Sequence, residues 1–396
     1  MTHIVDQISQ GAIVLVRDRL LEQQAAGRKV LRLESGDPSF DVPAHVREAM
    51  EKALRDGQTH YTASAGIPAL REAMFRKVTD ENGLTVPSAD HLLVTNGAMH
   101  ALFILFQAVL EPGDEVLLPD PMWTEVAENI KLGGGRPVPV RLHPERGYQY
   151  VPEEIEAAIT PRTRAIFINT PHNPTGAVAQ RSTLEAIAAL AEKHDLLLVS
   201  DEAYEHVLFD EEQHVSLGSL PAAAGRTISV FSMSKTYAMS GLRLGYAAIP
   251  DRVHLERMKK LIRCTINGVN SVTQYGALAA LTGPQEATRA MAREYQFRRD
   301  VLFKALQAAP YVEPFEPRGS FFLWARILPD WPGYQGQSDD WSMTNYLIDK
   351  AGIGSTPGTA FGAAGIGHIR FAFSCSTAQV QEAAGLLPSV LADAGK

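Results

Sequence analysis

The feature that most constrains the fold of this chain is the alternation of short apolar runs with helical patterns between about residues 92 and 249. Strands that are apolar on both sides are typical of parallel sheets with both faces covered by helices. The segments between the runs are long enough to hold crossover helices. The pattern therefore predicts an α/β fold with a mostly parallel sheet. The expected strands are Leu92–Val94, Val116–Leu118, Val138–Val140, Ala165–Ile168, Leu196–Val199, Ile228–Phe231 and Gly245–Ile249.

Composition narrows the class of protein. A chain of 396 residues with 45% hydrophobic content can bury a large core, and its length predicts about two or three domains. The net charge of -8, without a block of like charges, argues against a nucleic-acid partner or a polybasic membrane patch. Chemistry on small molecules is the expectation.

The cysteines and the first residues predict a cytoplasmic location. Cys264 and Cys375 cannot form a disulfide framework and have no metal-binding spacing. The apolar run from Ala12 to Val16 is interrupted by Arg17, so nothing resembles a signal peptide. No segment approaches the ~20 apolar residues that span a bilayer. We therefore expect no association with a membrane.

Polar and aromatic residues follow five of the expected strands. Ligands of parallel sheets bind at the carboxyl ends of the strands, so these residues are expected to form a site. They are Thr95–Met99, Pro119–Trp123, Asn169–Gly176, Ser200–Tyr204 and Ser232–Lys235.

Lys235 is the expected nucleophile. A lysine that is desolvated near other cations loses its proton more easily and can attack a carbonyl to form an imine. Ser232, Ser234 and Arg243 could bind a phosphate beside it. A single lysine is usually a solvated surface charge, and these neighbouring groups argue for the reactive role.

The order and spacing of several motifs resemble those of class I/II aminotransferases, the aspartate-aminotransferase-like branch of fold-type I pyridoxal-phosphate enzymes. The resemblance covers nearly the whole chain. The matching stretches are Ser35–Pro38, Tyr61, Ala65–Arg71, Asn173–Gly176, Asp201–Tyr204, Ser232–Lys235, and Pro357–Gly358 with Arg370.

This resemblance implies a mixed seven-stranded sheet flanked by helices and a smaller α+β domain. We place the large domain at residues 46–285 and the small domain at residues 1–45 plus 286–396. A helical stretch, Glu286–Gln307, opens the second part of the small domain, and shorter strand-like runs follow it. The segment Gly333–Asp340 is expected to be a mobile loop.

The resemblance also implies roles around the ring of pyridoxal 5'-phosphate. Lys235 would carry the cofactor as a Schiff base, and Asp201 would pair with the pyridine nitrogen, which makes the ring an electron sink. Asn173 and Tyr204 match the residues that hydrogen-bond the ring hydroxyl. Trp123 matches the aromatic residue that stacks on the ring. Taken alone, Asp201 could be a helix cap, Asn173 a turn residue and Trp123 a core residue.

A phosphate cup is implied at the start of the helix that follows Thr95. Gly97, Ala98 and Met99 would offer backbone N–H groups there, and Ser232, Ser234 and Arg243 would complete the cup. Tyr61 resembles the tyrosine that reaches the phosphate of the other subunit. A homodimer with shared active sites is therefore expected.

Arg370 matches the arginine that binds the substrate α-carboxylate through a bidentate pair, with help from Gly36 and Asn173. The implied reaction is a ping-pong transfer of the amino group of an L-amino acid to a 2-oxo acid such as 2-oxoglutarate. Lys235 would serve as general base and acid.

The identity of the amino donor stays open between aspartate-type and neutral or aromatic amino acids. Several aspartate-type members have a lysine where this chain has Met99, so recognition of a distal carboxylate needs another cation. Arg263 from a partner subunit could supply it. Arg318 could instead be a plain surface charge.

Other functions share part of this pattern. A carbon–sulfur β-lyase or an oxidase of a basic amino acid would need the same Lys235, Asp201 and Arg370. A transcription regulator needs an added basic DNA-binding module, and the aminotransferase pattern is expected to begin directly at the start of this chain. A catalytically dead binding protein disagrees with the complete set of cofactor residues.

Overall fold

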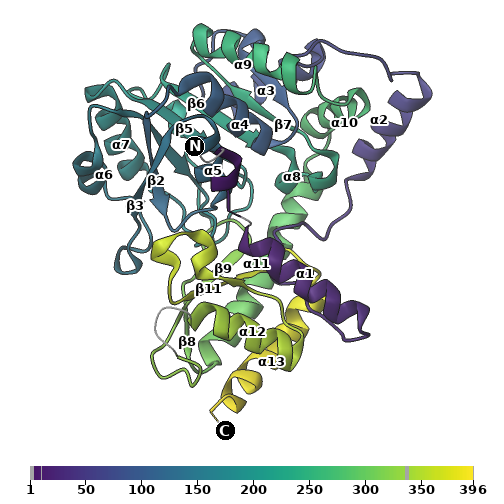
Figure 1. Cartoon of the computed structure of the whole chain (residues 1–396). Coiled ribbons are helices and arrows are strands. Elements are labelled where there is room, and N and C mark those ends of the chain that lie inside the picture. The colour runs from purple at the N-terminus through teal and green to yellow at the C-terminus, as the bar shows by residue number, and fades with distance from the viewer. Residues whose placement is uncertain (1–3, 10, 335–338, 396) are drawn as a thin grey trace.

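The computed structural model describes residues 4–9, 11–334 and 339–395, and it contains two sheets (Figure 1). The larger sheet has seven strands in the order β1-β7-β6-β5-β4-β2-β3. β7 runs antiparallel to both of its neighbours, β1 and β6, and the other four pairs are parallel, so the predicted mixed, mostly parallel sheet is confirmed. The strands are β1 Leu92–Thr95, β2 Glu115–Asp120, β3 Arg136–Arg141, β4 Thr163–Asn169, β5 Leu197–Asp201, β6 Thr227–Ser232 and β7 Gly245–Ala248.

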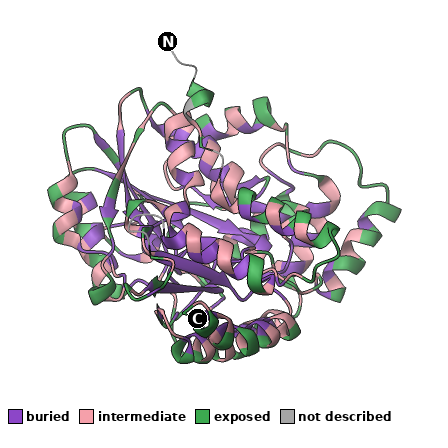
Figure 2. Cartoon of the chain, turned by 60° about the horizontal axis from the view of Figure 1, so that its bottom comes forward, coloured by how far each residue is buried: buried purple, intermediate pink, exposed green. Residues whose placement is uncertain are grey.

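Helices cover both faces of this sheet. Alternate residues of each strand point to opposite sides, and their apolar side chains are buried by helices on each side. Val116 and Leu118 of β2 pack with one cluster of helices, whereas Leu117 packs with the other. In Figure 2 the strands are mostly buried and lie between helices whose outer faces are exposed. The helices around this sheet are α2 Ala44–Arg55, α3 Pro68–Asp80, α4 Ala98–Val109, α5 Glu125–Leu132, α6 Pro152–Ala158, α7 Arg181–Lys193, α8 Met233–Thr236, α9 Arg252–Thr265 and α10 Ser271–Thr282.

The second sheet has four antiparallel strands in the order β10-β11-β9-β8 and lies below the first in Figure 1. Its core includes Leu31 and Leu33, which shows why the N-terminal segment belongs beside the C-terminal one. The strands are β8 Val312–Pro314, β9 Phe322–Ile327, β10 Thr356–Pro357 and β11 His368–Ala372, and the helices are α1 Ala12–Ala25, α11 Glu286–Ala308, α12 Asp339–Ala351 and α13 Thr377–Asp393. The domain boundaries at residues 45 and 285 stay predictions.

Short 3-10 helices connect several of these elements. They are η1 Ile4–Gln7, η2 Ala89–His91, η3 Pro144–Arg146, η4 Leu217–Ser219, η5 Ser240–Leu242, η6 Gly358–Phe361 and η7 Ala363–Gly365. Within the loop expected at 333–340, residues 335–338 lie outside the described residues, and Asp339 and Asp340 begin α12 instead. Among the described residues, no helix has the length and apolarity needed to cross a membrane.

Gly245 allows β7 to pass close to the start of α4. A Cβ at this position would lie 2.6 Å from the backbone nitrogen of Ala98 and 2.7 Å from the carbonyl oxygen of Phe231. Neither backbone atom can move away alone, so we expect Gly245→Ala to lower the free energy of unfolding by about 1–3 kcal/mol. Denaturant unfolding followed by circular dichroism measures this change.

Gly385→Ala is the matched control. Gly385 is an exposed position within α13, and an added Cβ there meets nothing within 4 Å. Because alanine is favoured over glycine in helices by up to about 1 kcal/mol, this variant should be as stable as the parent or more so. Equal stability of the two variants would contradict the close approach at Gly245.

Candidate active site

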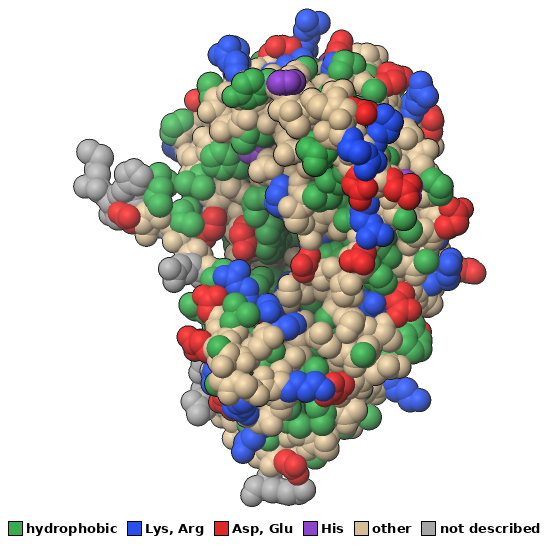
Figure 3. Space-filling view, turned by 90° about the vertical axis from the view of Figure 1, so that its right-hand side faces the viewer, with side chains coloured by type: hydrophobic (Ala, Val, Ile, Leu, Met, Phe, Trp, Pro, Cys, Tyr) green, Lys and Arg blue, Asp and Glu red, His purple; other side chains and the backbone are tan. Residues whose placement is uncertain are grey.

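The described part of the chain contains a cavity of about 420 Å³ between the two sheets. Figure 3 shows the surface hollowed between the upper part of the molecule, formed by the large sheet, and the lower part. Its walls come from the carboxyl ends of the parallel strands, from the segment after α1 and from the small sheet. The lining residues are Ile13, Arg17, Arg32, Glu34, Ser35, Gly36, Ala98, Met99, Leu102, Met122, Trp123, Val126, Phe167, Asn169, Asn173, Asp201, Ala203, Tyr204, Ser232, Ser234, Lys235, Arg243, Phe322 and Arg370.

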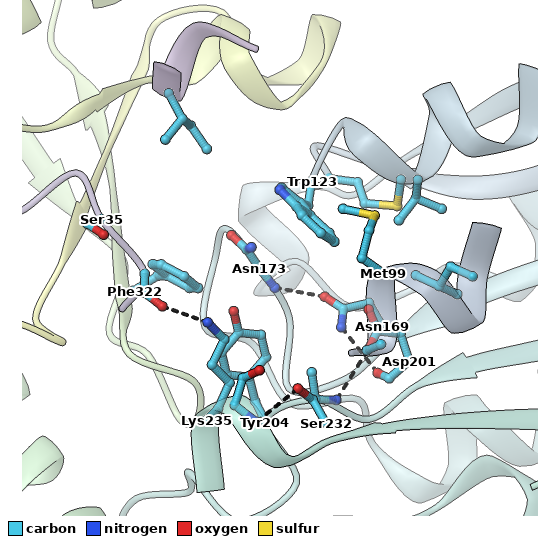
Figure 4. Close-up of a pocket in the computed structure, with 18 of the residues that line it drawn as sticks. Ser35, Met99, Trp123, Asn169, Asn173, Asp201, Tyr204, Ser232, Lys235 and Phe322 are labelled. Carbon is cyan, nitrogen blue, oxygen red and sulfur yellow. Dashed lines mark hydrogen bonds between the residues drawn. The ribbon is translucent and has the colours of Figure 1, made fainter. Parts of the chain in front are cut away.

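Lys235 reaches this cavity from α8, the short helix that follows β6 directly. Its Nζ donates a hydrogen bond of 2.7 Å to the carbonyl oxygen of Gly36 (Figure 4). Burial lowers the pKa of Lys235 to about 8; Asp37 opposes this shift, and Arg243 and Arg370 add to it. The amine therefore loses its proton close to neutral pH, as a nucleophile or general base requires.

Asp201 ends β5 and is nearly buried beside this lysine. Burial raises the pKa of Asp201 to about 7, although the backbone N–H of Ala203 opposes the shift. A cation placed next to the carboxyl would lower that pKa again. The position is thus suited to a positively charged partner inside the cavity.

Asn169 and Asn173 connect this strand end with the substrate side of the cavity. The side-chain amide of Asn169 donates to the carbonyl of Asp201 at 3.2 Å, and its Oδ1 accepts from the backbone N–H of Asn173 at 2.9 Å (Figure 4). The Asn173 Oδ1 in turn accepts a hydrogen bond of 3.0 Å from Arg370. One chain of hydrogen bonds therefore links the large sheet to the small one.

Arg370 enters from β11 and is almost completely buried. Its guanidinium lies between two rings, 4.1 Å from the centre of Phe322 and 4.7 Å from that of Phe361, and donates to the carbonyl of Glu34 at 2.7 Å. Burial lowers its pKa to about 10, so it remains charged at neutral pH. Within the described residues its Nε has no hydrogen-bond partner.

The residues expected to form a phosphate cup lie around the first turn of α4. Gly97 has a φ of 80° and precedes the helix. The first N–H groups of a helix have no partner within it and can bind an anion. Arg243 lies against Gly97, because its Nη2 is 2.7 Å from the position of an added Cβ. Ser232, Ser234 and Ala98 line the same cavity. The expected members of the cup are thus brought together.

Trp123 and Tyr204 also line the cavity. Tyr204 is held by the edges of Phe321 and Phe322, at centroid distances of 5.2 and 5.7 Å. Burial raises the pKa of its hydroxyl, which therefore stays protonated and can donate a hydrogen bond.

Three residues considered in the sequence lie elsewhere. Tyr61 is 91% exposed and lines a separate depression together with residues 267–271. Arg263 is exposed on α9 and does not line the cavity. Arg318 is exposed and pairs with Asp210 at 3.3 Å, as a surface charge would.

The sequence assigned no individual role to several cavity residues. Asn169, the last residue of β4, was expected at the site only as one of the polar strand ends. Arg17, Arg32 and Glu34 had no such signal, since they lie far along the chain from the strands. The Nε of Arg32 is 2.5 Å from Glu34 Oε1, and Glu34 is fully buried.

The sequence and the structure of this chain are similar to those of known proteins. Residues 28–387 match the family described as aminotransferase class I and II. An aspartate/prephenate aminotransferase of Thermus thermophilus is 40% identical over 383 residues, which cover 96% of this chain and 95% of the relative. An arginine–pyruvate transaminase of Pseudomonas aeruginosa is 38% identical over 92% of this chain and 91% of the relative.

Solved structures agree. Aspartate aminotransferase from Thermus thermophilus with maleate has a TM-score of 0.90 at 37% identity, covering 98% of this chain and 99% of that one. The aspartate aminotransferase from Rhizobium meliloti has a TM-score of 0.93 at 31% identity, covering 99% and 98%. Because the sequence, the fold and the residues that line the cavity agree, the chain belongs to the class I and II aminotransferase family, in its aspartate-aminotransferase-like branch, and is a transaminase.

Proposed function

We propose that the chain binds pyridoxal 5'-phosphate and transfers the amino group of an L-amino acid to a 2-oxo acid, with Lys235 as the amine that holds the cofactor. The observation that carries this proposal is the grouping of a lysine of lowered pKa, a buried carboxyl and an anion-binding cup around one cavity. Each group is the chemical complement of one part of the cofactor.

The residues present fit the cofactor. Arg243, Ser232, Ser234 and the start of α4 offer the charge and donors that a phosphate needs. Asp201, with its raised pKa, would pair with the ring nitrogen, and Trp123 is free to stack on the ring. When bound, the cofactor supplies an electron sink for the Cα of the substrate.

The remaining steps fall to side chains of this chain. The amine of Lys235, whose positive charge burial disfavours, would take the proton from the substrate Cα and deliver it to C4', the cofactor carbon that receives the amino group. Asn173 and Tyr204 would bind the ring hydroxyl, and Gly36 would contact the substrate beside Lys235. The free Nε of Arg370 and its neighbouring N–H groups would bind the α-carboxylate.

For the donor, we infer an amino acid with a side-chain carboxylate. Among the described cationic residues that line the cavity, Lys235, Arg243 and Arg370 already have roles, which leaves Arg17 and Arg32. Of the two, Arg32 has the less exposed side chain, 29% against 49% for Arg17, so we take Arg32 as the candidate cation. The relatives named for aspartate support this inference.

The proposed role of Lys235 predicts that Lys235→Ala loses more than about 10³-fold in kcat, because the proton transfer loses its base. Steady-state transamination assays measure this, and borohydride reduction with peptide mass spectrometry should find the parent cofactor on Lys235. Lys304→Ala, an exposed lysine of α11, is the control and should keep parental turnover. Parental turnover of Lys235→Ala would refute the assignment.

The donor is identified by adding single amino acids to the holoenzyme without any oxo acid and following its visible absorbance. We expect aspartate or glutamate to convert the cofactor most efficiently, and Arg32→Leu to raise the concentration that they require by about 10-fold or more. Conversion by aromatic amino acids alone would instead indicate that the substrate side chain binds the apolar residues around Met99. Pyruvate and ammonia released without an acceptor would indicate a β-lyase.

We propose that two copies form a homodimer with shared sites, because the large aromatic ring of Tyr61 is 91% exposed in a single chain and lies away from the cavity of that chain. Lys235→Ala and Tyr61→Ala chains should each be impaired. Random mixed dimers should regain about a quarter of parental activity, since half of them contain one intact site. No regain in dimers shown to be mixed would place Tyr61 outside the partner's site.

A further inference from the structure

A buried polar cluster lies behind the turn that carries Asp201 and Tyr204. Along this turn, Asp201 and Tyr204 line the cavity, whereas Glu202 and Glu205 do not. Glu202 is 0% exposed and Glu205 is 8% exposed. Two carboxylates are therefore buried on the back of the segment from which we expect two cofactor contacts.

Lys77 of α3 is the cation of this cluster. Its Nζ donates to Glu205 Oε1 at 2.5 Å and to Asn82 Oδ1 at 2.8 Å, and the residue is only 7% exposed. The same ammonium lies 4.4 Å from the ring centre of Phe231. One buried charge thus contacts two separate segments of the chain.

Both segments carry residues of the candidate site. Glu205 directly follows Tyr204, and the carbonyl of Glu202 accepts a hydrogen bond from the backbone N–H of Glu205 at 3.2 Å. Phe231 is the second-last residue of β6, which ends at Ser232. The helix α8, which carries Lys235, begins at the next residue, Met233. The position of Lys77 therefore couples the Asp201–Tyr204 turn to the lysine segment.

The other members of the cluster hold the two carboxylates in place. Glu202 accepts hydrogen bonds from Ser200 at 2.9 Å and Ser216 at 2.6 Å, and contacts His214 Nε2 at 2.7 Å. The amide of Asn82 bridges Glu205 Oε2 and Ser216 Oγ, at 2.7 and 2.8 Å. Both carboxylates are fully partnered, so the turn is fixed from behind.

Fold stability alone does not explain such a pair. Bringing two charges out of water costs much of what their attraction returns, and apolar replacements of buried pairs are often neutral or stabilising. Burial by itself would raise the pKa of Glu205, yet Lys77, His206 and His214 lower it to about 2. Glu205 therefore remains an anion that holds the ammonium over Phe231.

A metal ion is the rival occupant, since ligand atoms of Glu202, Glu205 and His214 lie within 4.8 Å of one another. The ammonium of Lys77 already neutralises Glu205, and a second cation beside it would be repelled. The cluster is therefore assigned to Lys77 and not to a metal.

We propose that Lys77 is a positioning residue of the transamination reaction: by binding Glu205 and covering Phe231, it fixes Asp201 and Tyr204 relative to Lys235. The inference rests on the proposed roles of these three residues. It adds a requirement outside the cavity, because Lys77 does not line it.

The test separates positioning from charge balance with Lys77→Met and the double variant Lys77→Met/Glu205→Gln. The single variant leaves a buried anion without its cation, so its Tm should fall. The double variant removes both charges and should regain most of that Tm. If Lys77 positions the site, the kcat of the double variant nevertheless stays roughly 10–100-fold below that of the parent, because the reacting groups are misplaced.

A second readout follows the cofactor directly. The pH dependence of the visible absorbance of the holoenzyme reports protonation at the Lys235 nitrogen, and its midpoint should move by about half a unit or more in the double variant. Lys52→Met is the control, because Lys52 of α2 forms an exposed pair with Asp56, the residue that follows this helix. It should leave Tm, kcat and the midpoint at parental values.

Recovery of Tm, kcat and the midpoint together in the double variant would overturn the proposal, since Lys77 would then only balance a charge. This outcome is distinct from failure of the proposed function, which would appear in the parent enzyme as absent transamination. If the single variant does not fold, the double variant alone decides.

Discussion

Burial of a parallel sheet on both of its faces is the constraint on which the rest of this structure depends. A sheet of this kind needs a crossover helix after most of its strands, and each crossover returns the chain so that the strands end along one edge. The loops at that edge have backbone groups that the sheet does not pair, so polar side chains and ligands can bind there. The edge of β4, β5 and β6 thus collects Asn169, Asp201 and Ser232.

The second consequence concerns charge in a confined space. Lys235, Asp201 and Arg370 are withdrawn from water, and burial is the largest cause of all three pKa shifts. It lowers the pKa of the two cations and raises that of the acid, which moves the lysine and the acid toward neutral pH. Small changes in their neighbours then decide their charge, so a buried cation as distant from the cavity as Lys77 can matter.

The small sheet provides the other half of the site. Arg370 of β11 is held between Phe322 and Phe361, and its hydrogen bond to Asn173 crosses to the large sheet. The segment with Glu34 and Gly36 joins the same place from the beginning of the chain. A substrate bound between the sheets would therefore contact three stretches that are distant in sequence.

Much of this arrangement was predictable from sequence, because apolar periodicity reports which faces are buried and polar strand ends report where a ligand can bind. The seven strands along the chain, the helix that begins at Ala98 and the grouping of polar strand ends around Lys235 follow from such local signals. The order of the strands within the sheet does not follow from them. The family motifs added the expected role of Arg370, which its surroundings in the sequence do not reveal.

The tertiary structure alone decided what depends on long-range packing. Arg32, Glu34 and Lys77 carry no motif, and each acquires its place because a segment far away in the chain folds against it. Tyr61 shows the opposite case, since a residue with a clear motif lies exposed and away from the cavity of its own chain. The sequence by itself determined the sheet, its helices and the chemistry at the strand ends, because those follow from local patterns of burial. The tertiary structure decided which charged groups surround the residues at the strand ends, because those groups come from segments that are distant in sequence.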